Sequence, residues 1–438
     1  MKFYSTNNKD LRVSLKEAVL TGMPADKGLY MPVTIPAVSQ TILKNLSGLS
    51  FPELAYELAS LFLDGDMDKQ SLEELTHEVF NFDAPLVHLI DNIYSLELFH
   101  GPTLAFKDFG ARFMSRLMAW FMREMSKELK ILVATSGDTG SAVANGFYNV
   151  PGIHVYVLYP AGKVSDIQEK QIATLGHNVT ALKVRGVFDD CQTLVKKALS
   201  DDRLRENALV SSANSINISR LIPQIFYYFH AFAGLDKKKW ESVVISVPSG
   251  NFGNLTAGLM AKRMGLPVKR FVDSANINDV VPEYLMSGKY NPRPSRQTLS
   301  SAMDVGNPSN FVRILDLYDH SYSAITNDIW GKGFTDNETR CKIRETYEKT
   351  GYLCDPHGAV GLLGLTEYIN CFDKQATGIF LETAHPAKFK PIVEDVIRQP
   401  ITIPDRLAQC MEKRVQAIEI DNDYKQFFEI ANPVAGSQ

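Results

Sequence analysis

The residue with the clearest chemical potential in this chain is Lys107, which lies in the segment 98–110 among apolar and aromatic neighbours. Burial removes water from a lysine, and this loss of hydration favours the neutral amine over the ammonium ion. A neutral lysine amine can condense with an aldehyde to form a Schiff base. The alternative is a lysine whose alkyl chain crosses the core while its charged end reaches water. For this lysine considered alone, that alternative is favoured.

A second segment, residues 130–144, has the pattern of a buried strand, a polar turn with glycines and the start of a helix. The hydroxyl groups of Thr135, Ser136 and Thr139, together with free backbone amides, would suit a carboxylate. An ordinary turn, with Asp138 or Thr139 as the helix cap, is the alternative.

A third segment, residues 242–258, repeats this pattern of strand, glycine loop and helix. Gly250 and Gly253 let backbone amides approach an anion closely, and the helix dipole adds a favourable potential. No Walker lysine follows the glycines, and their spacing differs from the dinucleotide-binding fingerprint. The loop therefore predicts a site for one compact phosphate, with a plain turn between packed elements as the alternative.

Two more polar clusters follow predicted strands. Residues 211–220 end a strand and open a helix, and their only cation, Arg220, could form a bidentate pair with a phosphate or carboxylate. Helix capping by Asn217 or Ser219, with a merely solvated arginine, is the alternative. In residues 377–389, Thr383 and His385 come at the end of a strand, where open α/β sheets bind their ligands.

Together these five segments resemble the threonine synthases of the bacterial and fungal type, which belong to the fold-type II group of pyridoxal phosphate enzymes. The similarity begins at Tyr4, continues through the segments 13–20 and 27–32, and extends to Phe389, in order and with family-like spacing. It is much weaker from about Arg398 onward. The resemblance implies an α/β protein with two parallel-sheet lobes, the cofactor between them, and an N-terminal accessory domain.

The resemblance also implies a role for each matching residue. Lys107 would carry pyridoxal 5'-phosphate as a Schiff base and move protons, and Thr383 would present its hydroxyl to the pyridine nitrogen of the cofactor. The loop after the third strand would hold the cofactor phosphate, and the other polar loops would hold the substrate. The implied cofactor ligands are Gly250, Asn251, Phe252, Gly253 and Asn254, and the implied substrate ligands are Thr135, Ser136, Thr139, Ser215, Asn217 and Arg220.

One position departs from the wider fold group, which usually has asparagine where this chain has Asp138. An ionised aspartate beside the phenolate oxygen of the cofactor would be repulsive, so this residue is expected to be protonated and hydrogen-bonded or turned away. The reaction implied by the resemblance converts O-phospho-L-homoserine and water to L-threonine and phosphate, through γ-elimination and β-addition of water.

Composition agrees with an enzyme of this kind. The 438 residues carry a net charge of −4 without a basic run, which argues against nucleic acid or an anionic membrane as a partner. Five cysteines have neither metal-ligand nor disulfide spacing, and the nine histidines show no paired spacing, so no metal is expected. The N-terminus lacks the apolar core of a signal peptide. These features favour a cytoplasmic protein, acting as a monomer or a homodimer.

The alternation of apolar runs and helical patterns predicts four units. These are an accessory domain (1–95), a small α/β lobe with Lys107 (96–218), a large α/β lobe with the phosphate loop and Thr383 (219–400), and a C-terminal extension (401–438). Strands are expected at 131–134, 154–158, 179–184 and 209–212 in the small lobe, and at 243–247, 270–273 and 378–382 in the large lobe. Residues 279–310 interrupt the alternation and are expected to form a mobile loop over the site.

Three other classes of function compete with this interpretation. One is a sibling enzyme on the same scaffold, either a dehydratase or a phospholyase that makes 2-oxobutyrate. The second is a non-catalytic relative that keeps the fold as a binding module, which the presence of Lys107, Ser136 and Thr383 argues against. The third is a nucleotide-binding protein, which the missing Walker lysine argues against.

Overall fold

The computed structural model describes residues 1–135 and 137–432. Its smaller lobe is built on a parallel sheet with the strand order β14-β8-β7-β6-β9. These strands are β6 (Glu128–Ala134), β7 (Ile153–Pro160), β8 (Val179–Arg185), β9 (Ala208–Ser212) and β14 (Ile418–Asp421). The four strands predicted for this lobe are confirmed, and β14, from the predicted C-terminal extension, adds a fifth strand beside β8.

The larger lobe contains a sheet with the order β12-β11-β10-β13-β5-β4, in which only β4 runs antiparallel to its neighbour. Its strands are β4 (Leu86–Ile90), β5 (Ile93–Glu97), β10 (Val243–Pro248), β11 (Arg270–Ala275), β12 (Ile329–Gly333) and β13 (Thr377–Glu382). The three strands predicted here are confirmed. The hairpin of β4 and β5 begins in the predicted accessory domain and crosses its boundary at residue 95, yet the whole hairpin extends this sheet.

The N-terminal region forms a small antiparallel sheet with the order β2-β1-β3, followed by helices. Its elements are β1 (Lys2–Ser5), β2 (Asn8–Ser14), α1 (Leu15–Thr21), β3 (Tyr30–Pro32), α2 (Gln40–Asn45), η1 (Leu46–Gly48), α3 (Phe51–Leu63) and α4 (Lys69–Val79). Helix α3 begins with a capping box, because Glu53 reaches back to the backbone amide of Ser50 at 2.8 Å.

The remaining helices cover the two large sheets. Those of the smaller lobe are α5 (Lys107–Met122), α6 (Asp138–Phe147), α7 (Asp166–Ala173), α8 (Phe188–Leu199), α9 (Asp202–Asn207), α18 (Asp405–Met411) and α19 (Tyr424–Ala431). Those of the larger lobe are α10 (Ile218–Ala233), η2 (Lys237–Ser242), α11 (Gly253–Arg263), α12 (Val280–Ser287), η3 (Ser301–Met303), α13 (Phe311–Leu317), α14 (Tyr322–Asp328), α15 (Asp336–Thr350), α16 (Pro356–Phe372), η4 (Pro386–Phe389) and α17 (Lys390–Ile397). No helix in the described part of the chain is long and apolar enough to cross a bilayer.

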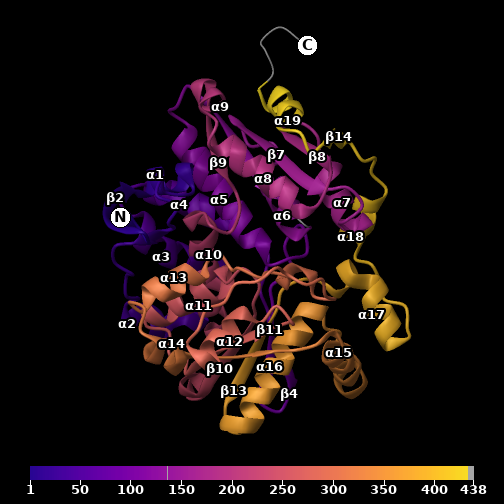
Figure 1. The fold of residues 1–438 in the computed structure, drawn as a ribbon. Coiled ribbons are helices and arrows are strands. Elements are labelled where there is room, and N and C mark those ends of the chain that lie inside the picture. The colour runs from indigo at the N-terminus through magenta and orange to yellow at the C-terminus, as the bar shows by residue number, and fades with distance from the viewer. Residues whose placement is uncertain (136, 433–438) are drawn as a thin grey trace.

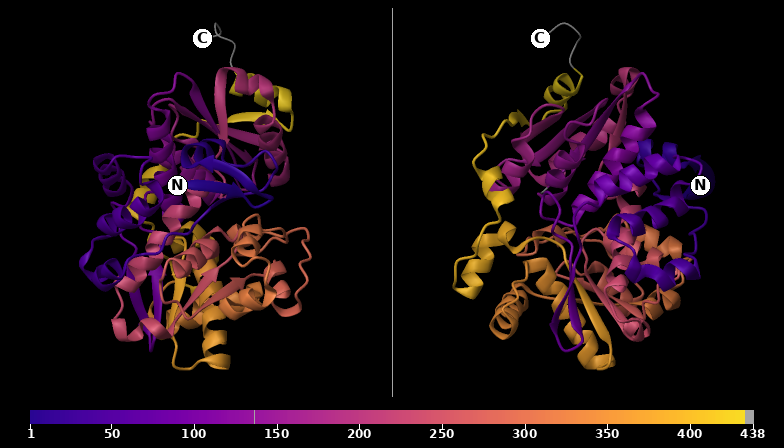
Figure 2. Two further views of the ribbon diagram at one scale, coloured as in Figure 1. Left: turned by 90° about the vertical axis from the view of Figure 1, so that its left-hand side faces the viewer. Right: turned by 180° about the vertical axis from the view of Figure 1, so that it is seen from behind.

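The apolar faces of the sheets determine where the helices pack and how the lobes are arranged. Every residue of β10 and β13 is buried, as expected for parallel strands covered by helices on both faces. Figure 1 shows the two lobes one above the other, with the C-terminal segment returning to the upper lobe. The N-terminal region lies along one side of both lobes (Figure 2), and its apolar residues belong to the same core as those of the lobes.

The order of the strands locates the places where ligands bind. In the smaller sheet the chain moves from β6 towards β8 on one side and places β9 on the other, so the order reverses between β6 and β9. In the larger sheet it reverses between β10 and β13. Open α/β sheets bind ligands beyond the carboxyl ends of the strands at such points. The four polar loops of the sequence, after β6, β9, β10 and β13, all lie there.

Hydrogen bonds hold residues 288–310, which follow α12, against the rest of the lobe. The amide of Arg293 donates to the carbonyl of Gly306 at 3.0 Å. Asp304 accepts from the hydroxyl of Thr298 at 2.7 Å and from the side-chain amide of Asn276 at 2.9 Å. This segment packs against the loop after β10, where the carbonyl of Ala302 lies 2.7 Å from the position that a Cβ on Gly250 would take.

We predict that Gly364→Ala destabilises the larger lobe. Within a helix this change normally adds about 0.5–1 kcal/mol of stability. Here helix α16 approaches the sheet so closely that the new methyl would lie 1.9 Å from Oγ and 2.9 Å from Cβ of Ser274. We therefore expect a loss of about 1–3 kcal/mol in denaturant unfolding. Gly48→Ala is the control, because nothing lies within 4 Å of its Cβ position; equal stability of both variants would contradict this prediction.

Candidate active site

Lys107 is the first residue of α5, and a short run of backbone hydrogen bonds places it beside the end of β13. The amide of Leu98 donates to the carbonyl of Glu382 at 2.9 Å, and the amide of Phe106 donates to the carbonyl of Thr383 at 2.9 Å. The amide of His385 donates back to the carbonyl of Leu104 at 3.1 Å. Two residues 276 positions apart in the sequence, Lys107 and Thr383, are thus brought to the same place.

The amine of Lys107 is poorly solvated. Its side chain is 15% exposed, and Nζ lies 4.7 Å from the centre of the Phe106 ring. Burial lowers the pKa of Lys107 below its usual value, the charges of Lys388 and Arg220 add to this effect, and the carboxylate of Asp138 opposes it. A larger share of this amine is therefore neutral than for a surface lysine, as its reaction with an aldehyde requires.

Asp138, at the start of α6, is ionised and paired. Its Oδ1 lies 2.7 Å from Nζ of Lys388 and accepts from the side-chain amide of Gln168 at 3.2 Å, while its Oδ2 lies 3.9 Å from Nζ of Lys107. Burial alone would raise the pKa of Asp138, but the charges of Lys388 and Lys107 outweigh burial and hold that pKa below its usual range. The sequence predicts that Asp138 is either protonated or turned away. The prediction of a protonated Asp138 is wrong, because the buried ammonium group of Lys388 balances its carboxylate.

The loop after β10 forms a cradle of backbone amides. Within the described residues, the amides of residues 250–255 donate no hydrogen bond to the protein. Phe252 adopts a left-handed conformation with φ of 62°, which is costly for a residue with a side chain and is enriched at functional sites. Helix α11 begins at Gly253, so its positive end points into the same loop.

Asn254 presents a free donor at this cradle. Its Oδ1 accepts from the hydroxyl of Tyr227 at 2.5 Å and from that of Tyr228 at 2.7 Å, which fixes the orientation of the amide. The Nδ2 group is buried and makes no hydrogen bond within the part of the chain that the structure describes. The two tyrosines are fully buried and also orient Asn254.

Thr383 follows β13 and keeps its hydroxyl available. Its side chain is largely buried, and its Oγ1 makes no hydrogen bond among residues 1–135 and 137–432. The residue before it, Glu382, is fully buried, and burial together with the charge of Asp355 raises its pKa well above the usual value. The end of β13 therefore offers a neutral hydroxyl and not a carboxylate to a bound ring.

The predicted substrate residues after β6 are only partly explained by the structure. Thr135 uses its hydroxyl to accept from the amides of Gly137 and Gly140, at 3.0 and 2.9 Å, so it shapes the loop. Thr139 is half-buried, and its hydroxyl makes no hydrogen bond in the described ranges. Ser136 lies outside the described residues. The roles of all three in substrate binding stay predictions.

The predicted residues after β9 divide into two groups. Ser215 accepts from the side-chain amide of Asn251 at 2.6 Å, which links the loops of the two lobes. Arg220 is buried; it donates to the carbonyl of Ala213 at 2.6 Å, and its Nε has no partner in the described part of the chain. Asn217, by contrast, caps α10 and donates to the carbonyl of Val19 at 2.9 Å, so the structure gives it the capping role that the sequence left open.

Sequence reasoning gave no role to the buried Lys388, and the buried His357 also lies at this site. His357 shares a hydrogen bond of 2.5 Å with Asp355 through Nδ1, and its Nε2 accepts from the amide of Ala302 at 3.2 Å. Because a backbone amide can only donate, Nδ1 must carry the ring proton. Asp355 also accepts from the amide of Ala384 at 3.3 Å, so this pair joins the end of β13 to the segment over Gly250.

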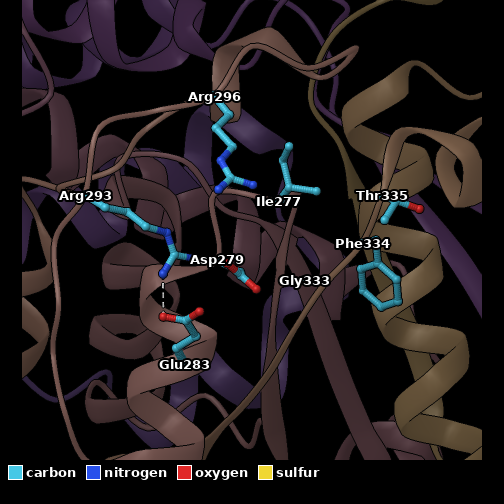
Figure 3. A pocket seen from close by; sticks show the side chains of 8 residues that line it. All are labelled: Ile277, Asp279, Glu283, Arg293, Arg296, Gly333, Phe334 and Thr335. Carbon is cyan, nitrogen blue, oxygen red and sulfur yellow. Dashed lines mark hydrogen bonds and ion pairs between the residues drawn. The ribbon is translucent and has the colours of Figure 1, made fainter.

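A pocket of about 430 Å³ lies elsewhere, beyond β11 and β12 (Figure 3). In it Arg293 pairs with Glu283 at 2.5 Å and also with Asp279. None of the residues that line it is among the predicted cofactor or substrate residues. Its residues are Ile277, Asp279, Glu283, Arg293, Arg296, Gly333, Phe334 and Thr335. Among the described residues no group of His, Cys, Asp and Glu side chains is arranged to hold a metal ion.

These features fit an aldehyde cofactor with a single phosphate. Counting only partners in the described part of the chain, the poorly solvated lysine amine makes no hydrogen bond, the amide cradle has six unpaired donors, and the buried donor of Asn254 also lacks an acceptor. Together with two parallel-sheet lobes, this site defines a pyridoxal phosphate-dependent enzyme of fold-type II.

Comparison with known proteins agrees with this class and narrows it. Family models for the pyridoxal-phosphate dependent enzymes, the threonine synthase N terminus and the threonine synthase C-terminal region match residues 84–377, 2–80 and 358–430. The threonine synthase of Haemophilus influenzae is 44% identical over 97% of this chain and 98% of its own. This chain therefore belongs to the threonine synthase family and is a pyridoxal phosphate-dependent lyase.

Solved structures show the same relationship. The crystal structure of threonine synthase from Escherichia coli is 40% identical and superposes with a TM-score of 0.91 over 98% of this chain and 99% of that one. A structure of threonine synthase from Brucella melitensis with bound pyridoxal phosphate is 33% identical, with a TM-score of 0.92 over 98% of each chain.

We predict that His357→Leu weakens cofactor binding by up to about tenfold. The variant removes the acceptor of the Ala302 amide, a partly buried hydrogen bond that contributes about 0.5–1.5 kcal/mol, and so loosens the segment that packs on Gly250. Titration of the apoprotein with pyridoxal phosphate measures the effect. His357→Gln, whose side-chain oxygen can replace Nε2 as acceptor, is expected to recover most of the affinity. Equal affinities of both variants and the parent protein would show that the contact is irrelevant to the cradle.

Proposed function

We propose that this protein converts O-phospho-L-homoserine and water to L-threonine and phosphate. The observation that carries the proposal is the placement of the poorly solvated Lys107 amine beside Thr383, in a chain of the threonine synthase family. The reaction removes phosphate from the γ-carbon and adds water at the β-carbon. When bound, pyridoxal phosphate supplies a conjugated ring that acidifies the carbon atoms next to the substrate amino group.

Lys107 is assigned both attachment of the cofactor and proton transfer at the substrate. Its Nζ makes no hydrogen bond in the described structure, so the amine can rotate between proton donor and acceptor positions. The cradle at Gly250, Asn251, Phe252, Gly253 and Asn254 is assigned to the cofactor phosphate. Thr383 is assigned to the pyridine nitrogen, where a neutral hydroxyl stabilises a ring charge less than a carboxylate would.

The two anionic groups of the substrate are assigned to different lobe loops. Thr139 is assigned to the carboxylate, together with Thr135 and Ser136, because it stands at the positive end of α6. Ser215 and Arg220 are assigned to the phosphate, because the arginine is a buried cation with a free donor. Asn217 belongs to this set only as the residue that caps the helix carrying Arg220.

The proposed location of the protein is the cytoplasm. All five cysteines are free, two of them buried and two exposed. Exposed free thiols persist in a reducing compartment.

The decisive experiment is incubation of the purified protein with O-phospho-L-homoserine, followed by identification of both products. Threonine and phosphate in equal amounts are the expected result, whereas 2-oxobutyrate would identify a phospholyase.

We predict that Lys107→Ala removes both the reaction and the visible absorption of the lysine-bound cofactor. Persistence of that absorption would mean that another lysine binds the cofactor.

We predict that Arg220→Met raises KM for the phosphorylated substrate about 10–100-fold while the cofactor absorption persists. A hydrogen bond to a charged group contributes about 1.5–3 kcal/mol, and burial lowers the pKa of Arg220 only to about 10, so the residue is a cation at neutral pH. Arg185→Met is the control, because Arg185 is exposed and pairs with Asp421 at 2.8 Å. An unchanged KM in the Arg220 variant would remove the arginine from the substrate site.

A further inference from the structure

A second lysine is buried more deeply than Lys107 in the same site. The side chain of Lys388, in η4, has no exposed surface. Its Nζ lies 2.7 Å from Oδ1 of Asp138 and donates to the carbonyl of Thr103 at 2.9 Å. A buried ammonium ion is stable only with such partners. Lys388 is therefore held as a cation in one fixed position.

Three ionisable side chains, those of Lys388, Asp138 and Lys107, adjoin one another at this point. Asp138 lies between the two lysines, with one carboxylate oxygen 2.7 Å from Lys388 and the other 3.9 Å from Lys107. If both lysines were protonated, this buried cluster would carry a net positive charge. Among residues 1–135 and 137–432, Lys388 has two close partners and Lys107 has none within hydrogen-bonding distance, so Lys107 is the one that gives up its proton.

Other groups also face these three side chains. Arg220 from α10 and Asp355 from the turn before α16 act on Lys107 with opposite signs, and the ring of His357, whose Nε2 is unprotonated, also faces Asp138. Lys388 also acts on the buried Asp108, which accepts from the amide and hydroxyl of Thr103 at 2.8 and 2.6 Å. None of these groups touches Asp138 as Lys388 does.

We propose that Lys388 is a positioning residue that neutralises Asp138 and thereby keeps the amine of Lys107 uncharged and reactive. This inference rests on the proposed role of Lys107. Without Lys388, the carboxylate of Asp138 would have only Lys107 as a cationic neighbour and would hold it as an ammonium ion. Without Asp138, the charge of Lys388 would act on Lys107 uncompensated and would expel its proton more strongly.

The test is a set of four proteins: the parent, K388M, D138N and the double variant D138N/K388M. Each apoprotein is mixed with pyridoxal phosphate, and the rate at which the visible absorption of the lysine adduct appears is measured from pH 6 to 10, a range of about four units that spans the titration of a shifted lysine. The midpoint of this profile reports the protonation of Lys107. No substrate is needed, so the result is independent of the reaction proposed above.

The two single variants are expected to shift the midpoint in opposite directions. In K388M the midpoint moves up by about one unit, which makes the reaction about tenfold slower below the midpoint. In D138N the midpoint moves down. The double variant, whose pair is neutral as in the parent, returns close to the parent value. If Lys388 had a purely structural role, its replacement would lower stability. The two single variants would then not shift the midpoint in opposite directions, and the double variant would not restore it.

Controls separate this inference from folding and from the identity of the cofactor lysine. K390M removes a neighbouring lysine that pairs with Glu394 at 3.0 Å, and its midpoint should stay unchanged. If K388M does not fold, K388Q keeps a donor for the carbonyl of Thr103 while removing the charge. Midpoints that are equal in all folded variants would overturn the inference. Adduct formation by Lys107→Ala would instead overturn the assignment of Lys107.

Discussion

The backbone hydrogen bonds between residues 98–106 and 382–385 connect the carboxyl ends of β5 and β13, and the placement of the site depends on them. They carry the chain out of the larger sheet and begin α5 at Lys107, against the smaller lobe. An amine at this point is buried by both lobes and lies next to Thr383. Because backbone groups make these bonds, many side chains could vary without displacing the lysine.

Contacts between loops of the two lobes complete the site. Asp138 of the smaller lobe pairs with Lys388 of the larger lobe, and Ser215 of the smaller lobe binds Asn251 of the larger lobe. Buried Arg313 in α13 adds a third connection, since it donates to the carbonyls of Tyr30 and Ile216. The first of these contacts places fixed charges beside the amine of Lys107 before any ligand binds, and such preorganisation is a major source of catalytic power in enzymes.

Much of the fold could be predicted from the sequence, because buried parallel strands have continuous apolar runs and the loops after them have distinctive glycines. The strands around residues 131–134 and 243–247 are examples. The hairpin of β4 and β5 and the strand β14 were harder to assign, since pairing with a distant strand leaves no local pattern. Residue type and motif were enough to propose Lys107, Arg220 and Thr383 as site residues, whereas they did not point to Lys388, because a lysine in an apolar segment is usually solvated.

The sequence by itself determined the class of chemistry, since a lysine among apolar residues and two glycine loops follow one another in the order and spacing of the family that the chain resembles. Only the tertiary structure decided the charge state of the site. The pairing of Asp138 with Lys388 joins residues 250 positions apart, and the free donor of Asn254 depends on two tyrosines that take its oxygen. Electrostatic interactions fall off with distance and depend on burial, so they follow from the folded arrangement and not from spacing along the chain.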